Sequence, residues 1–347
     1  MAFKGSVQFA NFICRFGEKE MLDLCEEVVL PAFRCLESKR SFKDTSYFFF
    51  NVELVSLVSA DGVSSELAIA GRFVKNTILK RNQVFEEGKL VKSHHQIPSA
   101  PSALFVLTLS DHKLMYIPEV SGAPTLESFK ATAERFIVSK HTVYIKGLIE
   151  SRLASEYPEG ANRIEKSKVR KEIVEANPKP TLNVVSLASE ENFNTFVDRF
   201  DSLDSLSIKL LRPNNEIDND GFFKAIRDKG NGLGASGSSL NFRNTEGLEK
   251  EKVKEVASNA LDGNTSVRLS GTDKAGAKLS GTNEDFKLQV KVEILPKSMK
   301  EAAQTLYGVF LLNKVAGHIK TGGQVYVQEK AEKLLYLAKK YLGGNND

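Results

Sequence analysis

The sequence lacks any long apolar run. No stretch of its 347 residues approaches the roughly 18 apolar residues that a membrane-spanning helix needs. The segment from Met1 to Phe16 is interrupted by Lys4, Gln8, Asn11 and Arg15, so it lacks the apolar region of a signal peptide. We therefore expect a soluble, cytoplasmic protein, and any membrane role would run through a partner.

Cysteine is also scarce. The three cysteines, Cys14, Cys25 and Cys35, are an odd number and form no CxxC pair. Cys25 falls on the apolar stripe of an expected helix, where a thiol packs as a small hydrophobic group. Buried, reduced thiols are therefore favoured over a disulfide or a metal site, in keeping with a reducing compartment.

The motifs of common enzyme chemistry are missing as well. The chain has no GxSxG elbow, no P-loop and no HExxH spacing among its five histidines. A GxGxxG string occurs at Gly232, Gly234 and Gly237, but a dinucleotide site needs a strand before it and a helix after it, so a flexible loop is favoured. We expect no catalytic centre, metal or cofactor; a dispersed catalytic site stays open as an alternative.

The chain is longer than one hydrophobic core usually serves, which favours two domains. The prolines of Asn177-Pro178-Lys179-Pro180 stop a helix and impose an extended link. The sequence predicts an α+β protein: a β-rich globular domain with helices (1–176), a hinge (177–181), a smaller α+β domain, ferredoxin-like or swivel (182–296), and C-terminal helices (297–347).

Local patterns predict elements inside the first domain. Thr125, followed by Leu126 and Phe129, has the spacing of a helix start. Apolar and aromatic residues alternate over 48–54, as in a half-buried strand. The segment 142–149 is rich in β-branched residues and is expected to close the domain as a further strand.

Basic residues alternate with apolar ones in the second half. Net charge is only +4, so local clustering carries the information. In Phe286–Ile294 a strict period of two puts Lys287 and Lys291 opposite the apolar face. The same pattern turns Arg268 and Lys209 outward from their own strands.

The connection between the last two strands adds Lys274 and Lys278. If these strands are neighbours, one sheet face presents several cations and almost no acids. Such a face can follow DNA phosphates without reading bases. It lacks the aromatics of a base-stacking platform, and solvated lysines on a strand face are the ordinary alternative.

Two segments resemble the RexA-like phage-exclusion proteins. One is Pro101-Ser-Ala-Leu-Phe-Val106, followed by a strand and the helix start Gly122-Ala-Pro-Thr-Leu126. The other runs from Phe200 (FDSLDSLSIKLLRP) to Pro213 and is followed by the hairpin Arg268–Gly276 (RLSGTDKAG). The order of elements agrees from about Leu90 to Phe310.

The resemblance implies a cytoplasmic homodimer with a globular domain and a mobile swivel domain that binds DNA non-specifically. It also implies antiviral defence, in which a DNA sensor triggers a membrane-embedded effector. The basic hairpin of the family maps near Ser270 and Thr272, neither of which is basic here. Arg268, Lys274 and Lys278 are the nearby cations that could substitute.

The leading hypothesis is a non-catalytic, largely sequence-independent DNA-binding sensor in phage exclusion. It contacts the backbone of double-stranded DNA through Lys209, Arg268, Lys274, Lys278, Lys287 and Lys291. Two alternatives stay open: a protein-interaction module of a defence system without nucleic-acid contact, and a nuclease with a dispersed site.

Overall fold

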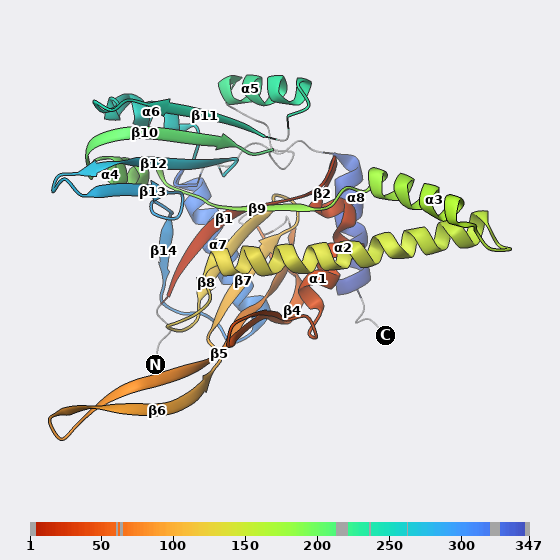
Figure 1. Ribbon diagram of the computed structural model, residues 1–347, viewed down its shortest axis with the longest axis horizontal. Helices are drawn as coiled ribbons and strands as arrows, with labels where there is room; N and C mark the ends of the chain where they lie inside the picture. The colour runs from red at the N-terminus through yellow and green to blue at the C-terminus, as the bar shows by residue number, and fades with distance from the viewer. Residues whose placement is uncertain are drawn as a thin grey trace.

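The protein is a mixed α+β structure built around a large, curled antiparallel sheet (Figure 1). The computed structural model describes residues 5–59, 62, 65–212, 221–235, 237–261, 263–319 and 327–343; for residues 80–82 and 93–95 it describes the backbone alone. In this part of the chain no helix is long and apolar enough to cross a membrane.

Ten of the described strands form the large sheet, in the order β14-β1-β8-β7-β5-β4-β3, with β2 and β9 paired to β1 and β6 paired to β5. β1 pairs with four other strands, β14, β2, β8 and β9, and nearly all of its side chains are buried. The strands are β1 (Gly5–Phe16), β2 (Lys19–Glu20), β3 (Arg40–Phe42), β4 (Thr45–Val58), β5 (Ser65–Glu86), β6 (Lys89–Ser99), β7 (Ser102–Thr108), β8 (Lys113–Pro118), β9 (Thr181–Ser186) and β14 (Gln289–Val292).

Helices cover both faces of this sheet. One face packs against α7 (Met299–Val315). The other packs against η1 (Met21–Leu24), η2 (Cys25–Val29), α1 (Leu30–Arg34), the first half of α2 (Leu126–Glu156) and α8 (Gln328–Leu342). Its centre is aromatic: the Phe33 and Phe49 rings lie 4.7 Å apart, and Phe129 packs on both. Burying each ring contributes roughly 2–3 kcal/mol.

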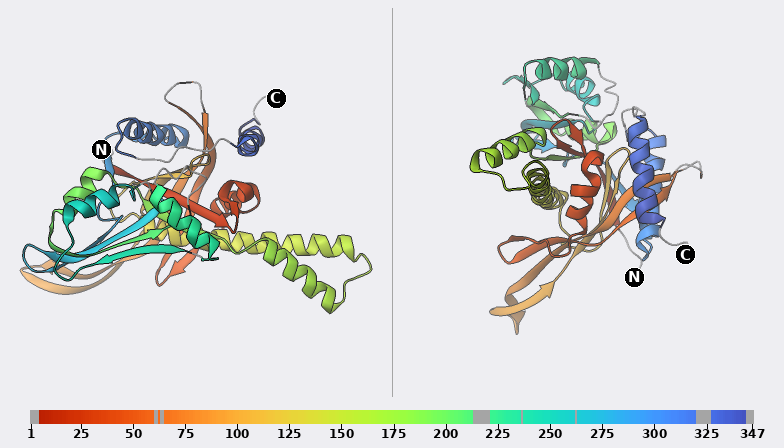
Figure 2. Two further views of the ribbon diagram at one scale, coloured as in Figure 1. Left: turned by 90° about the horizontal axis from the view of Figure 1, so that it is seen from above. Right: turned by 90° about the vertical axis from the view of Figure 1, so that its right-hand side faces the viewer.

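α2 begins as predicted, with the Thr125 side chain accepting from Ser128 N at 3.2 Å. The strand predicted at 142–149 is wrong, because these residues continue α2. Their spacing explains the difference: Ile145 lies one turn from Ile149, and both face α3 (Arg163–Ala176), where Val169 and Ile173 are buried. α2 and α3 form a helical hairpin that projects from the body (Figures 1 and 2).

A second sheet has four strands in the order β11-β10-β12-β13. These are β10 (Phe200–Leu210), β11 (Ser238–Arg243), β12 (Thr265–Asp273) and β13 (Lys278–Thr282), accompanied by α4 (Glu190–Val197), α5 (Gly221–Gly232) and α6 (Lys250–Ser258). Its inner face packs on α4 and α6. Gly281 permits this contact, because a Cβ there would lie 2.2 Å from the Phe196 ring.

The boundary between the two sheets differs from the predicted hinge at 177–181. β9 follows that hinge but pairs with β1 over Ala10–Arg15, inside the large sheet. Asn177 is buried and accepts from Lys19 Nζ at 3.0 Å, so the link is fixed against the body. The strand order of the small sheet does not confirm a ferredoxin-like arrangement.

The chain instead passes between the sheets at two adjacent crossings. It leaves the large sheet after β9 and returns before β14, where Ala188 and Lys287 form an antiparallel bridge. Leu187 joins both sides, since its N–H donates to Phe9 O and its carbonyl accepts from Leu288 N. Residues 189–286 thus form a unit attached through a two-stranded connection.

A buried amide anchors that unit to the large sheet. The Asn11 side chain donates to Gly263 O at 3.2 Å and to Asn264 Oδ1 at 3.0 Å, and it accepts from Lys113 Nζ at 3.0 Å. Asn11 and Lys113 have no exposed surface. Gly263 has φ +86°, and a Cβ there would lie 2.6 Å from Leu187 and 2.8 Å from Asn11.

We predict that Gly263→Ala destabilises the protein by roughly 2–4 kcal/mol, because it adds backbone strain to steric overlap at the junction. Gly276→Ala is the matched control, since Gly276 also has a positive φ, of 76°, but faces open space. It should cost only about 1 kcal/mol. Urea unfolding of both variants checks this, and equal losses would contradict the crowding of the junction.

Candidate nucleic-acid interface

The outer face of the small sheet is polar and basic. Directly opposed residues in the register share a face, so the side chains of this face follow from the strand pairing. They are Ser202, Ser205, Ser207, Lys209, Ser239, Asn241, Arg243, Ser266, Arg268, Ser270, Thr272, Lys278, Ser280 and Thr282. None of them is acidic or aromatic. We call this set, together with Lys274 of the adjoining turn, the cationic face.

Five cations belong to it: Lys209, Arg243, Arg268, Lys274 and Lys278. All five are exposed, and within the described ranges none of them is in an ion pair. From the strand spacing, neighbouring cations stand about 7–12 Å apart. Such an array attracts a polyanion, although three carboxylates border it: Asp204 accepts from Ser202 Oγ, Asp273 from the turn backbone, and Asp285 from Thr282 N and Oγ1.

Hydroxyl groups fill the space between the cations. Arg268 lies opposite Ser207 on β10, and Lys209 lies opposite Ser266 on β12. Ser205 Oγ and Ser270 Oγ are 2.6 Å apart and share one hydrogen bond. Serine hydroxyls donate readily to phosphate oxygens, so they complement the charges with short-range contacts.

The turn between β12 and β13 holds Lys274 in place. The Asp273 carboxylate accepts from Ala275 N and Ala277 N, both at 2.9 Å. Gly276 takes the positive φ that closes the turn. The only carboxylate of this turn is thereby used by backbone donors, and the Lys274 side chain points into solvent.

The alternation in the sequence correctly predicted that Lys209 and Arg268 face outward from their strands. The structure places both on one face with Lys278 and Lys274. It does not bring Lys287 and Lys291 to this face. Lys291 lies in β14, opposite Ser6 of the large sheet, and Lys287 lies at the crossing, 3.0 Å from Glu284.

The predicted strand Phe286–Ile294 is in fact divided between the sheets. Phe286 packs in the core of the small sheet, while Val290 and Val292 pack against the large one. Only Gln289–Val292 forms a strand. A period of two reports which residues share a face, but not which sheet supplies the partner.

Arg243 was missed by the sequence reasoning. It belongs to β11, where Leu240 and Phe242 alternate with Asn241 and Arg243. The alternation of apolar and polar residues that predicted an outward Arg268 is present in β11 too. It was overlooked because β11 follows a glycine-rich stretch and only half of its residues are apolar. The glycine string itself follows helix α5, which ends at Gly232, so no strand precedes it.

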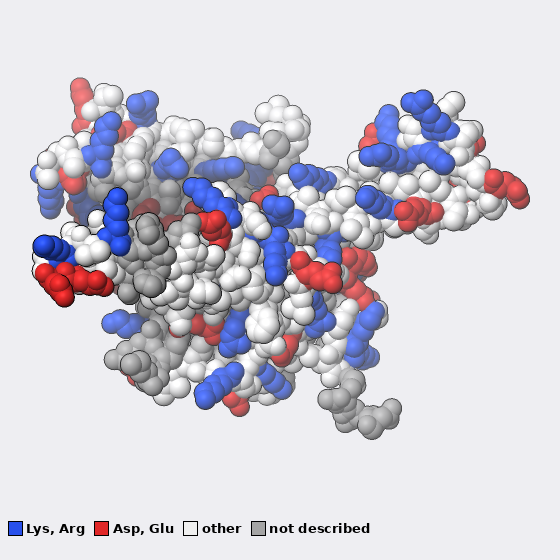
Figure 3. All heavy atoms as spheres, turned by 60° about the horizontal axis from the view of Figure 1, so that its bottom comes forward, with Lys and Arg blue, Asp and Glu red and all other residues white. Residues whose placement is uncertain are grey.

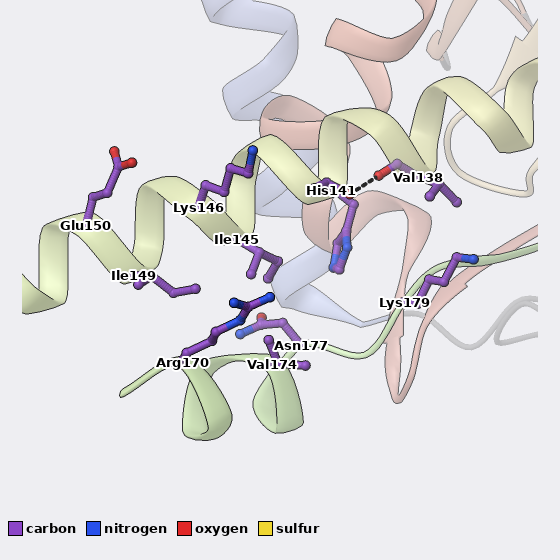
Figure 4. Close-up of a pocket in the computed structure, with 11 residues that line it drawn as sticks. Val138, His141, Ile145, Lys146, Ile149, Glu150, Arg170, Val174, Asn177 and Lys179 are labelled. Carbon is purple, nitrogen blue, oxygen red and sulfur yellow. Dashed lines mark hydrogen bonds between the residues drawn. The ribbon is translucent and has the colours of Figure 1, made fainter. Parts of the chain in front are cut away.

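A second surface feature is a groove of about 610 Å³ between α2 and α3. Figure 4 shows His141, Ile145 and Arg170 directed into it, whereas Lys146 and Glu150 point away. The His141 ring stacks on Phe16 at 5.6 Å, and burial, with Lys19 nearby, lowers the pKa of His141. The groove is mainly apolar and offers no converging set of polar groups.

Charged side chains elsewhere are mixed in sign. On the side of the molecule seen in Figure 3, basic and acidic groups intersperse over the body and over the projecting hairpin. Among the described residues, no three His, Cys, Asp or Glu side chains are grouped so that they could hold a metal ion. No protein-family model matches the chain, and no curated protein matches it.

One half-buried carboxyl pair, Glu66 and Asp111, lies away from the cationic face. Glu66 accepts from Leu109 N at 3.1 Å, from Ser110 N at 3.0 Å and from Ser110 Oγ. Burial, and then the nearby charge of Asp111, raise the pKa of Glu66 to about 7. Folding therefore favours the neutral acid, and stability falls as the pH rises from about 4.5 through 7.

We predict that Glu66→Gln stabilises the protein at pH 8 relative to wild type by about 1–3 kcal/mol more than it does at pH 5, because the ionisation penalty is removed. Glu53→Gln, at an exposed glutamate of β4 outside this pair, is the control. Thermal unfolding at both pH values measures this; a pH-independent effect of Glu66→Gln would contradict the raised pKa.

Proposed function

We propose that this protein binds double-stranded DNA through the cationic face, with little dependence on base sequence. The observation that carries the proposal is the set of five exposed cations interleaved with hydroxyls on one sheet face, where the bordering carboxylates of Asp204, Asp273 and Asp285 are held by hydroxyl or backbone donors. Charge and hydroxyl donors suit phosphate oxygens. The absence of aromatics from the face argues for backbone contacts rather than stacking on bases.

The resemblance to RexA-like phage-exclusion proteins supports a place for this binding in antiviral defence. In that proposal the protein is a non-catalytic, homodimeric sensor of DNA that acts on a membrane-embedded effector. The two-stranded connection at Ala188 and Lys287 supports the swivel part of the proposal, since both crossings of the chain between the sheets lie side by side there, near the contact of Asn11 with Gly263.

A second candidate is a protein-interaction module. The apolar groove between α2 and α3 favours it, because exposed apolar grooves on helical hairpins suit an amphipathic partner segment. Recovery of a stoichiometric protein partner after nuclease treatment, with no duplex binding, would favour this function over the first.

The proposal predicts strong salt dependence. Neutralising about five phosphates gives a slope of log affinity against log salt of about −4 to −5. Fluorescence anisotropy with unrelated duplexes of equal length measures it, and their affinities should agree closely. No binding at about 50 mM salt would refute the proposal, because electrostatic attraction is strongest at low salt.

Charge reversal locates the site. Arg268→Glu combined with Lys209→Glu should lower duplex affinity by roughly 30-fold or more and make the salt slope shallower by about 2. Lys291→Glu is the matched control, since Lys291 is an exposed strand lysine of the large sheet, and it should change affinity far less. Equal losses in both variants would remove the cationic face from consideration.

A further inference from the structure

A two-stranded β-arm projects from the large sheet. β5 pairs with β4 only as far as Asn76 and with β7 as far as Val74. Beyond them, residues 77–99 pair only within the hairpin of β5 and β6. The arm extends roughly 30 Å and stands clear of the body in Figures 1 and 2. Glu87 and Gly88, both with positive φ, form its tip.

The arm exposes large apolar side chains. Phe85 and Leu90 are paired across the strands near the tip and are 72% and 70% exposed. Leu79 and Ile97 form a second pair, 54% and 51% exposed. Residues 79 and 85 lie an even number of positions apart on β5, and the register shift between Arg81 and Gln83 accounts for the odd spacing of Leu90 and Ile97 on β6, so both pairs share one face. An isolated ribbon of this kind gains little from burial within itself, so its apolar surface indicates a partner.

The charge of the arm indicates an anionic partner. Residues 77–99 contain four Lys or Arg against two Glu, and Glu86 is opposed across the strands by Lys89. Lys92, opposite Gln83, lies between the two apolar pairs on the same face. A second copy of this face would bring like charges together, which disfavours self-association through it.

We propose that the β-arm enters the minor groove of the bound duplex and inserts Phe85 and Leu90 as a wedge between base pairs, which kinks the DNA. Apolar side chains on narrow elements act in this way in architectural DNA-binding proteins, with cations beside them on the phosphates. Lys92 supplies such a cation here, on the same face as Phe85 and Leu90, whereas Lys89 lies on the other face opposite Glu86. This inference rests on the proposed function, because it adds a second contact to DNA held at the cationic face.

The placement of the arm allows both contacts. Seen from above (Figure 2, left), α4 and α6 lie on one side of the small sheet and the arm projects on the other, while Figure 1 shows the small sheet and the arm at opposite ends of the molecule. The arm lies on the side away from α7 and α8 in the right-hand view of Figure 2. A duplex that contacts both must therefore extend from the small sheet along this side of the molecule to the arm.

The test measures DNA bending by energy transfer between dyes at the ends of a duplex of roughly 30 base pairs with a central, flexible TA step. Phe85→Ser/Leu90→Ser should abolish the bend and lower affinity roughly tenfold. Val84→Ser/Val91→Ser is the matched control, since it removes the neighbouring cross-strand pair from the opposite face, and it should keep the bend.

A further variant, Glu87→Gln, removes an acid at the tip. It should raise affinity about two- to threefold by relieving repulsion from phosphates. If Phe85→Ser/Leu90→Ser and Val84→Ser/Val91→Ser both lose the bend, the duplex affinity of Glu87→Gln decides. A raised affinity supports the proposal, and an unchanged affinity overturns it. An unaltered bend in Phe85→Ser/Leu90→Ser also overturns it.

The failures of the two proposals are distinguishable. A wild-type protein that does not bind duplex at low salt removes both, whereas binding without any bend removes only the wedge. A loss of dimer mass in Phe85→Ser/Leu90→Ser, measured by light scattering with the bend retained, makes the arm a contact between copies and overturns the proposal. Binding of anionic vesicles by the arm, with no change in DNA bending, overturns it likewise.

Discussion

The relative position of the two sheets depends on the buried side chain of Asn11. This amide lies in the middle of the central strand β1, accepts from Lys113 and donates to the backbone and side chain at Gly263 and Asn264. A buried polar group must satisfy its hydrogen bonds, because leaving one unmade costs about 1–3 kcal/mol. The pairing therefore fixes Gly263 and Asn264, just before β12, against the large sheet.

The register of the small sheet matters for the proposed DNA-binding surface. Lys209, Arg243 and Arg268 act together only while β10, β11 and β12 keep their register, and the packing of α4 and α6 on the inner face maintains it. The loop anchor and the paired crossing at Ala188 connect this sheet to the body at neighbouring points. If the hydrogen bonds of Asn11 to Gly263 and Asn264 broke, the small sheet would stay joined to the body through the paired crossing at Ala188 and Lys287. Rotation of the small sheet about that crossing is the motion that the proposed swivel requires.

Local periodicity predicted the parts of the fold that depend on local chemistry. Val267 and Leu269 flank Arg268, so the direction of its side chain could be read from three residues, and the same holds for Lys209. Strand partners could not be read in this way. Lys291 alternates as regularly as Lys209, yet its strand joins β1, which is far away in sequence. The segment 142–149 was predicted to be a strand because β-branched residues favour strands. It is helical because Ile145 and Ile149 pack on α3.

Lysine footprinting tests the central claim, that DNA binds the outer face of the small sheet, most directly. The protein is acetylated briefly with and without a saturating duplex, and each lysine is quantified by mass spectrometry. The account predicts protection of Lys209, Lys274 and Lys278, with Lys291 and Lys171 modified equally in both samples. Protection of Lys171 on the helical hairpin, with Lys209 and Lys278 still reactive, would contradict it.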